Sequence, residues 1–426
     1  MSSETRNSFH GRLLEVDLTS GSTRVKTIPP DLIERYLGQK GLGARIFFED
    51  VPPDADPLSP ANELVFSTAV MTGTIVSCSA KLAITTKSPI TGTISDGSVG
   101  GHVGAELKYA GYDALVVKGR APGLSYLYLD PDKAEIRDAA FLKGEGTFRT
   151  DTLLKEKTGD EELKILAIGP AGENLVPFAC VSSERYRQLG RGGIGAVFGS
   201  KNLKAVVIKG WLPVHVPDMD ACMKTAAEAH ERDNVVNPEY EIYTDGTPVL
   251  VNMANESGLL PTRNFSAGRF EQYENINTTA FKAVRRAKKA CFSCGIACGN
   301  YVVDGAARVE GPEFETIALL GSSIGNGDRQ RLIELNALCD DLGLDTISTG
   351  GILAWMMEMT EKGLKDFGIR FGEGDKAAEL IRSMALKQGP GAEAALGTKV
   401  LSEKYGGKDF AMHIKGLELP GYDPRG

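Results

Sequence analysis

Three cysteines within eight residues are the side chains of this sequence best suited to hold a metal. Cys291, Cys294 and Cys298 form a C-x2-C-x3-C run, and the basic segment 285–289 precedes it. Gaps of two and three residues allow consecutive thiolates to turn toward one small object. The neighbouring lysines and arginines favour the thiolate form, which is the form that ligates metal. The run therefore predicts a metal centre.

Three interpretations of this run compete. An iron–sulfur cluster takes closely spaced thiolates. A structural zinc site needs a second ligand pair, and the sequence has no other C-x2-C and no H-x3-H. Unligated core cysteines are the third interpretation, although free cysteines are seldom bunched. A cubane cluster ordinarily takes four thiolates, so this interpretation requires a fourth ligand from elsewhere.

The other cysteines do not identify that fourth ligand by position. Cys339 lies on an apolar helical face, where a core role is expected. Cys78, Cys180 and Cys222 lie in unrelated segments. The fourth ligand is therefore either not a cysteine or absent from this chain.

The 50 glycines include three dense stretches, at residues 92–104, 190–199 and 343–351. Glycine is needed where the backbone turns through positive φ or comes close to a bulky group. Ordinary turns in a strand-rich domain would give the same clustering. Composition alone leaves both interpretations open.

The elements that must position these residues change in kind along the chain. Up to about residue 210, short apolar and β-branched runs predict strands at residues 64–66, 82–86, 114–117, 126–129, 165–168 and 205–208, with one helix at 147–157. Helical spacing then predicts helices at residues 219–232, 281–290, 328–342, 349–362, 376–387 and 391–404. We therefore expect an α+β fold, in which a strand-rich N-terminal domain with glycine loops is followed by an α-helical domain.

Charge and hydropathy exclude some classes of partner. The formal net charge is −8 and the basic residues are scattered, which argues against a nucleic-acid partner. No apolar stretch approaches the length of a membrane span, and the N-terminal segment lacks the apolar run of a signal peptide. Seven cysteines, three of them bunched, do not form a spread disulfide framework. We expect a cytoplasmic chain with reduced thiols.

Seven segments form a pattern that extends over the chain. They are residues 105–113 (AELKYAGYD), 168–174 (IGPAGEN), 190–205 (GRGGIGAVFGSKNLKA), the cysteine run, 310–315 (EGPEFE), 340–351 (DDLGLDTISTGG) and 419–426 (LPGYDPRG). Together, and in this order, they resemble the tungsten-containing aldehyde:ferredoxin oxidoreductase family. The resemblance implies a tungsten or molybdenum ion held by two pyranopterins, a [4Fe–4S] cluster beside one pterin, and Mg2+ bridging the pterin phosphates.

The resemblance also implies roles for individual residues. Cys291, Cys294 and Cys298 match the cluster ligands. The pterin-contacting positions are matched by Lys81, Ser98, Gly100, Arg187, Gln188, Gly190 and Arg191 in the first domain and by Asp340, Leu344 and Asp345 in the second. Lys81 departs from an expected arginine and Ser98 from an expected asparagine, which weakens the expected grip on the phosphates. As alternatives, the two arginines are solvated surface charges and the two aspartates end or cap helices.

The activity implied is oxidation of an aldehyde to a carboxylic acid, with ferredoxin or a similar carrier as electron acceptor. Glu315 matches the acidic residue near the metal and is the candidate general acid/base; its alternative is a carboxylate at a helix start. A non-catalytic or split cofactor-binding subunit that needs another polypeptide is the second hypothesis, and a relative acting on an acyl-thioester is the third. The sequence does not identify the aldehyde or choose between tungsten and molybdenum.

The change from strand-like to helical spacing predicts a domain boundary near residue 210, and the resemblance implies what each domain does. Residues 1–210 match the β-rich pterin-binding domain, and residues 211–417 match the helical domain with the cysteine cluster and the second pterin site. Residues 418–426 match the start of a third domain, which in the family brings the fourth cluster cysteine. We accordingly expect a C-terminally truncated chain, and a homodimer or a partner subunit.

Overall fold

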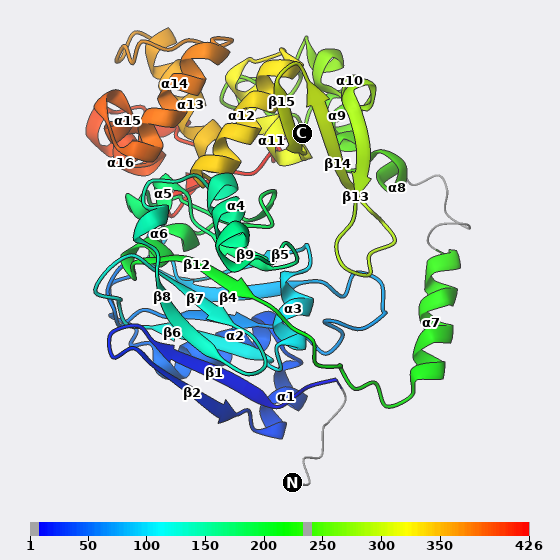
Figure 1. Cartoon of the computed structure of the whole chain (residues 1–426). Coiled ribbons are helices and arrows are strands. Elements are labelled where there is room, and N and C mark those ends of the chain that lie inside the picture. Colours follow the sequence, from blue (N-terminus) through cyan, green and yellow to red (C-terminus); the bar gives the residue numbers. More distant parts are fainter. Residues whose placement is uncertain (1–7, 233–240, 426) are drawn as a thin grey trace. The chain divides into compact units, whose positions relative to one another are not determined.

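The computed structural model describes residues 8–232 and 241–425 (Figure 1). Contacts divide the chain into two compact units. The first comprises Met1–Leu175, Ala179–Asn237 and Ala290–Gly295, and the second comprises Val176–Phe178, Pro238–Lys289 and Ile296–Gly426. The cysteine run is thus shared between the units, because Cys291 and Cys294 belong to the first and Cys298 to the second.

Two six-stranded sheets form the described part of the first unit. The first sheet has the order β2-β1-β6-β3-β4-β5 and is built from β1 (Arg12–Asp17), β2 (Ser22–Thr27), β3 (Leu64–Ser67), β4 (Leu82–Lys87), β5 (Ile94–Val99) and β6 (Ala114–Lys118). The second has the order β11-β10-β9-β12-β7-β8 and is built from β7 (Ser125–Leu129), β8 (Ala134–Asp138), β9 (Lys164–Ala167), β10 (Val181–Ser183), β11 (Arg187–Leu189) and β12 (Leu203–Ile208). The pairs β1–β6 and β7–β12 are parallel, and the other ladders are antiparallel.

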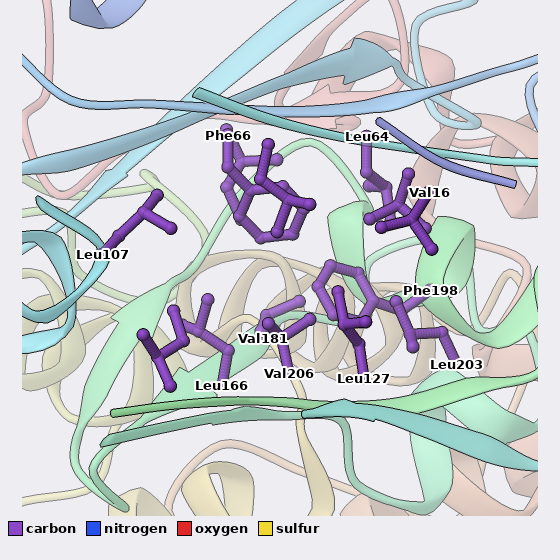
Figure 2. Close-up of a cluster of buried hydrophobic side chains, with 14 of the residues drawn as sticks. Val16, Leu64, Phe66, Leu107, Leu127, Leu166, Val181, Phe198, Leu203 and Val206 are labelled. Carbon is purple, nitrogen blue, oxygen red and sulfur yellow. The ribbon is translucent and has the colours of Figure 1, made fainter. Parts of the chain in front are cut away.

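A continuous apolar core joins the inner faces of these two sheets. Successive side chains of a strand point to opposite faces, so every second residue of a strand enters this core. Phe66 of β3 enters it from the first sheet, and Leu127 of β7 and Val206 of β12 enter it from the second (Figure 2). The first unit is therefore a sandwich whose central strands carry apolar residues on both faces.

Helices cover the outer faces of the sandwich. The helices of the first unit are α1 (Pro30–Tyr36), α2 (Gln39–Asp50), α3 (Val103–Tyr109), η1 (Ala140–Leu142), α4 (Thr147–Thr158), α5 (Pro170–Glu173), α6 (Ile194–Ser200) and α7 (Met219–Glu231). Leu42 and Phe47 of α2 pack on the outer side of β3 and β6, while Leu154 of α4 packs on the outer side of β7 and β12. These contacts explain why the central strands are buried on both sides.

The described part of the second unit is mainly helical. Its helices are α8 (Glu241–Asp245), η3 (Thr247–Val249), α9 (Leu250–Ser257), η4 (Tyr273–Ile276), α10 (Thr278–Val284), α11 (Phe314–Leu320), η5 (Ser322–Ile324), α12 (Arg329–Leu342), α13 (Thr346–Glu361), α14 (Gly374–Leu386), α15 (Gly389–Ala394), α16 (Thr398–Tyr405) and η6 (Lys408–Phe410). Its strands are β13 (Arg285–Lys289), β14 (Gly299–Asp304) and β15 (Ala307–Glu310), which form one sheet, and β16 (His413–Ile414) and β17 (Leu417–Glu418), which form another.

Helix α13 is the central element of this unit. Its residues from Ile347 to Thr360 are buried, and Gly350 allows α11 to approach closely, because a Cβ at Gly350 would lie 2.4 Å from the backbone oxygen of Leu319. A side chain at Gly350 would push the two helices apart. None of the helices in the described part of the chain combines the length and apolar composition that a membrane-spanning helix needs.

The predicted fold class is confirmed, and two of the predicted helices need correction. Residues 281–290 do not form one helix, because α10 ends at Val284 and the basic residues that follow form β13, paired with β14. Residues 391–404 form parts of two helices, because the chain turns at Gly397, where φ is +85°. The six strands predicted up to residue 210 and the helix at 147–157 are all present.

Candidate metal and cofactor centre

The cysteine segment of the first unit lies against a loop that is distant in sequence. The Sγ atoms of Cys78 and Cys294 are 3.5 Å apart. Burial raises the pKa of the Cys78 thiol, and the neighbouring thiols of Cys294 and Cys291 raise it further. Three thiols therefore interact in this region, and a bound cation would be needed to stabilise them together as thiolates. Sequence reasoning missed Cys78, because no motif or spacing relates residue 78 to residue 294.

Backbone contacts fix this meeting of segments. The backbone N–H of Cys78 donates to the carbonyl of Ser293 at 3.1 Å, and the Ser293 hydroxyl donates to the carbonyl of Ile75 at 2.8 Å. The backbone N–H of Phe292 donates to the carbonyl of Gly101 at 2.9 Å. The Phe292 ring also makes edge contacts with the rings of His102 and Tyr109. The segment Ala290–Gly295 is thus held at several points rather than by its thiols alone.

Gly100 and Lys81 lie beside Cys291. A Cβ at Gly100 would lie 2.6 Å from the Sγ atom of Cys291 and 4.0 Å from the Nζ atom of Lys81. The first distance is too short for a real side chain, so the absence of a Cβ at residue 100 is what makes room for the thiol. Two residues assigned to a pterin and one assigned to a cluster are therefore neighbours.

The edge strands of the two sheets bring together the other residues predicted in the first unit. β5, at one edge of the first sheet, contacts β11, at one edge of the second. Ser98 lies on β5, and Gly100 follows it directly. Arg187 and Gln188 lie on β11, and Gly190 and Arg191 follow in the turn that leads to α6. These six residues are therefore positioned by the same pair of strands.

Glu184 is an anchor of this site that sequence reasoning did not single out. Its carboxylate accepts from the backbone N–H groups of His102 at 2.5 Å and Val103 at 3.1 Å, and lies 2.8 Å from the Nδ1 atom of His102. Burial alone would raise the pKa of Glu184, but the hydrogen bonds and charge of His102 lower it below its usual value. Glu184 thereby fixes the start of α3 next to Gly100 and Gly101.

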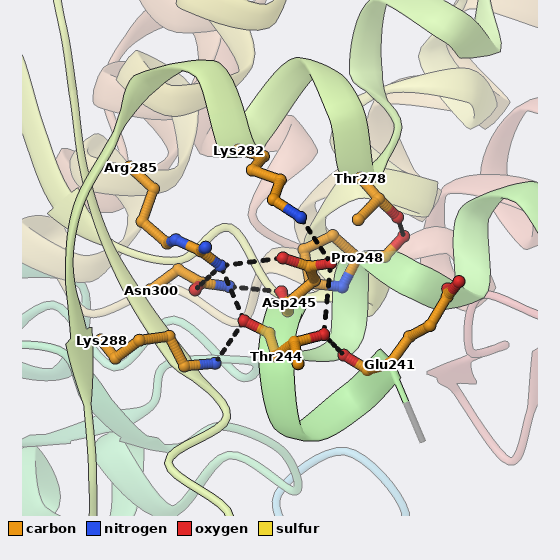
Figure 3. A network of polar contacts seen from close by, with 9 residues as sticks. All are labelled: Glu241, Thr244, Asp245, Pro248, Thr278, Lys282, Arg285, Lys288 and Asn300. Atoms are coloured by element: carbon orange, nitrogen blue, oxygen red, sulfur yellow. Dashed lines mark hydrogen bonds and ion pairs between the residues drawn. The ribbon is translucent and has the colours of Figure 1, made fainter. Parts of the chain in front are cut away.

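In the second unit, a polar network holds the strands on either side of the cysteine run (Figure 3). The Asp245 carboxylate pairs with Lys282 at 3.2 Å and Arg285 at 3.1 Å, and its backbone carbonyl accepts from the side chain of Asn300 at 2.7 Å. Burial and Arg285 lower the pKa of Lys288, while the charge of Cys298 opposes that shift. Lys288 therefore interacts electrostatically with Cys298.

The second set of predicted pterin residues lies around the turn between α12 and α13. Asp340 is buried and accepts from the side chain of Asn336 at 3.0 Å. Asp345 caps α13, accepting from the backbone N–H of Ile347 at 2.9 Å and the hydroxyl of Ser348 at 2.9 Å. Leu344 between them is buried. The capping function considered for Asp345 is thus present, and its assignment to a pterin stays a prediction.

Cys339 belongs to the core of the second unit. It is fully buried on α12, and burial followed by the charges of Asp340 and Asp345 raises the pKa of its thiol well above the usual value. A thiol with a raised pKa in such surroundings is a poor ligand and a normal core residue.

Glu315 lies in the first turn of α11. Its carboxylate accepts from the backbone N–H of Gly421 at 2.7 Å, and its charge adds to burial in raising the pKa of Tyr422. The helix-start position considered as an alternative is therefore observed. The carboxylate also has a phenol nearby with which it interacts electrostatically.

In the part of the chain that the structure describes, no three His, Cys, Asp or Glu side chains are arranged to hold a single metal ion. A cubane cluster distributes its thiolate ligands over four irons, so its ligands lie farther apart than those of one ion.

The geometry can be compared with known proteins. Two family models match the chain: aldehyde ferredoxin oxidoreductase, N-terminal domain, over residues 13–210, and aldehyde ferredoxin oxidoreductase, domains 2 and 3, over residues 221–426. The tungsten-containing aldehyde ferredoxin oxidoreductase of Pyrococcus furiosus is 40% identical over 98% of this chain and 70% of its own length. This chain belongs to the aldehyde ferredoxin oxidoreductase family. The oxidoreductase family predicted from the sequence is therefore confirmed.

The chain is also similar to two proteins whose names describe other reactions. An aliphatic sulfonate oxidoreductase, WOR-like subunit, of Pyrococcus furiosus is 30% identical over 96% of this chain and 70% of its own length. A solved active-site complex of benzoyl coenzyme A reductase with a dienoyl-CoA has a TM-score of 0.87 and 29% identity, over 98% of this chain and 66% of that chain. The chain thus spans about two thirds of that solved chain.

Proposed function

We propose that this chain is part of an oxidoreductase that oxidises aldehydes to carboxylic acids and passes the electrons to ferredoxin. The meeting of Lys81, Gly100 and Cys291 in one place carries the proposal, because a loop assigned to a pterin lies beside a cysteine assigned to the cluster. The identity of 40% to a tungsten-containing aldehyde ferredoxin oxidoreductase supports the reaction class.

The residues present fit the groups that this reaction requires. Cys291, Cys294 and Cys298 would hold a [4Fe–4S] cluster, and the space left by the missing Cβ of Gly100 supports this assignment. Lys81, Arg187 and Arg191 would neutralise pterin phosphates, which the glycine loops allow to approach the backbone. Asp340 and Asp345 would accept from pterin N–H groups in the second unit. A Mg2+ ion between the phosphates remains a further prediction.

When bound, a tungsten or molybdenum bis-pterin accepts two electrons from the substrate, and an iron–sulfur cluster passes them on singly. The balanced reaction is RCHO + H2O to RCOOH, with release of two protons and two electrons. The chain's own contribution is to orient the cofactor, polarise the carbonyl and move protons. Glu315 is the proposed proton carrier, and the N–H of Gly421 holds one of its oxygens in a fixed position.

An acyl-thioester substrate is the second candidate, and one observation favours it. The solved structure with a TM-score of 0.87 is a benzoyl coenzyme A reductase complex that contains a dienoyl-CoA. The same likeness supports the alternative in which this chain acts with a second polypeptide, as opposed to a homodimer.

The test is to purify the chain without oxygen from cells supplied with tungstate and molybdate. We expect tungsten or molybdenum together with iron by elemental analysis, and reduction of a viologen dye when an aldehyde is added. Oxidation of the reduced dye by a benzoyl-type thioester, or reduction of the dye by the corresponding dienoyl thioester, without any reaction with aldehydes would favour the second candidate. Protein that contains neither tungsten nor molybdenum would contradict both.

A further inference from the structure

A short turn of the second unit, residues 244–247, contacts both the end of the cysteine run and the helix that carries Glu315. Gly246 has φ of +76°, and a Cβ there would lie 2.2 Å from the backbone oxygen of Cys298. No side chain fits in that space, so the turn lies directly on the backbone of Cys298. The turn, Cys298 and Glu315 all belong to the second unit.

Thr247, the next residue of the turn, caps helix α11 from outside. Its hydroxyl accepts from the backbone N–H of Phe314 at 3.0 Å and donates to the carboxylate of Glu313. Phe314 is the first residue of α11, where a backbone N–H has no acceptor within the helix. Glu313 is the N-cap residue, but its side chain does not cap the helix. The Thr247 hydroxyl therefore supplies the cap that the local sequence does not.

The two residues that follow Phe314 are held by other segments of the second unit. The Glu315 carboxylate accepts from the backbone N–H of Gly421 at 2.7 Å, and the hydroxyls of Thr316 and Thr346 are 2.9 Å apart. These contacts restrain the later part of the first turn of α11. Its beginning is restrained by the cap, so loss of the cap would allow the start of the helix to move.

The turn that supplies the cap is itself firmly held (Figure 3). Arg285 of β13 donates to the carbonyl of Thr244 at 2.8 Å, and the side chain of Asn300 of β14 donates to the carbonyl of Asp245 at 2.7 Å. Two neighbouring strands thus fix the backbone of the turn. The hydrogen bonds of Thr247 therefore connect α11 to a fixed base.

We propose that Thr247 is a positioning residue for Glu315. Its hydroxyl fixes the start of α11, and with it the Glu315 carboxylate, relative to the backbone of Cys298. The inference rests on the proposed function, which assigns Glu315 to proton transfer. Thr247 takes up no proton from the substrate and only restricts where the carboxylate lies. A displacement of about 1 Å at a reacting group can lower a rate by about 100-fold.

Three variants separate the hydroxyl of Thr247 from its shape. Thr247→Val keeps the shape of the side chain and removes both hydrogen bonds, whereas Thr247→Ser keeps the hydroxyl. Thr278→Val is the matched control, because the Thr278 hydroxyl donates to the carbonyl of Pro248, the next residue along the chain from Thr247, at 3.0 Å. This control also removes a threonine hydroxyl beside η3, but it leaves the bonds of Thr247 in place.

The first measurement is amide hydrogen exchange of the chain without cofactors, read at Phe314 by mass spectrometry with fragmentation. We expect the Phe314 amide to exchange at least about tenfold faster in Thr247→Val than in the unmodified chain, because the opening of an amide is easier when its acceptor is lost. Thr247→Ser and Thr278→Val should exchange like the unmodified chain. Equal exchange at Phe314 in Thr247→Val and Thr278→Val would overturn the proposal.

The second measurement is aldehyde oxidation by the metal-loaded chain, with kcat expressed per bound tungsten or molybdenum. In Thr247→Val, kcat should fall about tenfold or more while KM changes less than about twofold, because proton transfer is affected and substrate binding is not. Thr247→Ser should restore kcat, and an unchanged kcat in Thr247→Val would overturn the proposal. A metal-loaded unmodified chain that oxidises no aldehyde would instead contradict the proposed function, and hydrogen exchange would still decide whether Thr247 holds α11.

Discussion

Gly100 lies directly against Cys291, where a Cβ would be 2.6 Å from the Sγ atom. Gly100→Ala should therefore displace Cys291 from its position and reduce the iron bound per chain at least about twofold, because overpacking at a fixed site forces neighbours to move. Iron analysis after anaerobic loading measures this. Gly123→Ala is the matched control, because a Cβ there meets nothing within 4 Å. Equal iron contents in both variants would show that Gly100 does not shape the site.

Glu315 is predicted to move protons, and removal of its charge tests this role. Glu315→Gln keeps the shape of the side chain but removes the base, so kcat for aldehyde oxidation should fall by about 100-fold or more. Tungsten and iron contents should stay unchanged, because no ligand is lost. Glu361→Gln, at the end of α13, is the control. A normal kcat in Glu315→Gln would show that this carboxylate has only a structural role at the start of α11.

Arg285 and Lys282 both pair with Asp245, and we expect them to contribute unequally to the free energy of unfolding. Arg285→Ala should lower the free energy of unfolding by about 1–3 kcal/mol, because it removes a half-buried charged donor from Asp245 and from the carbonyl of Thr244. Lys282→Ala should cost less than about 1 kcal/mol, because this side chain is 57% exposed. Urea denaturation of the two variants measures their free energies of unfolding. Equal losses of unfolding free energy in Arg285→Ala and Lys282→Ala would contradict the prediction.

Glu63 should make stability depend on pH. Burial, followed by the charge of Asp50, raises the pKa of Glu63 from 4.5 to about 7, so the folded chain favours the neutral acid. The contribution of protonated Glu63 to the free energy of unfolding is therefore fully present below the unfolded pKa of 4.5. It is lost as the pH rises through the folded pKa of about 7. Glutamine does not titrate, so the stability of Glu63→Gln relative to the unmodified chain should increase by about 2–3 kcal/mol between about pH 5 and about pH 8. An identical pH dependence of unfolding in both proteins would rule out this titration.

The fold of the first unit could be predicted where the residues themselves carry the pattern. Val116 and Val117 face opposite sides of one strand, and both sides are apolar, so β6 was predictable from its composition. β13 was not, because its residues Arg285–Lys289 are mostly charged and form a strand only through pairing with β14. For β13, pairing with β14 outweighs the low strand propensity of its charged residues.

In the candidate site, too, local patterns were predictable from the sequence and contacts between distant segments were not. The spacing of Cys291, Cys294 and Cys298 predicts a metal centre from the local sequence alone, and this assignment stays a prediction. The contact of Cys78 with Cys294 depends on how the loop between β3 and β4 folds, and no local pattern encodes it. Glu184 was missed for the same reason, since its partner His102 is 82 positions away.

The most direct test of the account is a single-turnover experiment on anaerobically purified, oxidised chain that contains tungsten and iron. An aldehyde is added without any external acceptor, and electron paramagnetic resonance follows the cluster. We expect a reduced [4Fe–4S] signal that requires the aldehyde and is absent from Cys294→Ala. A metal-loaded chain whose cluster stays oxidised in excess aldehyde would contradict it.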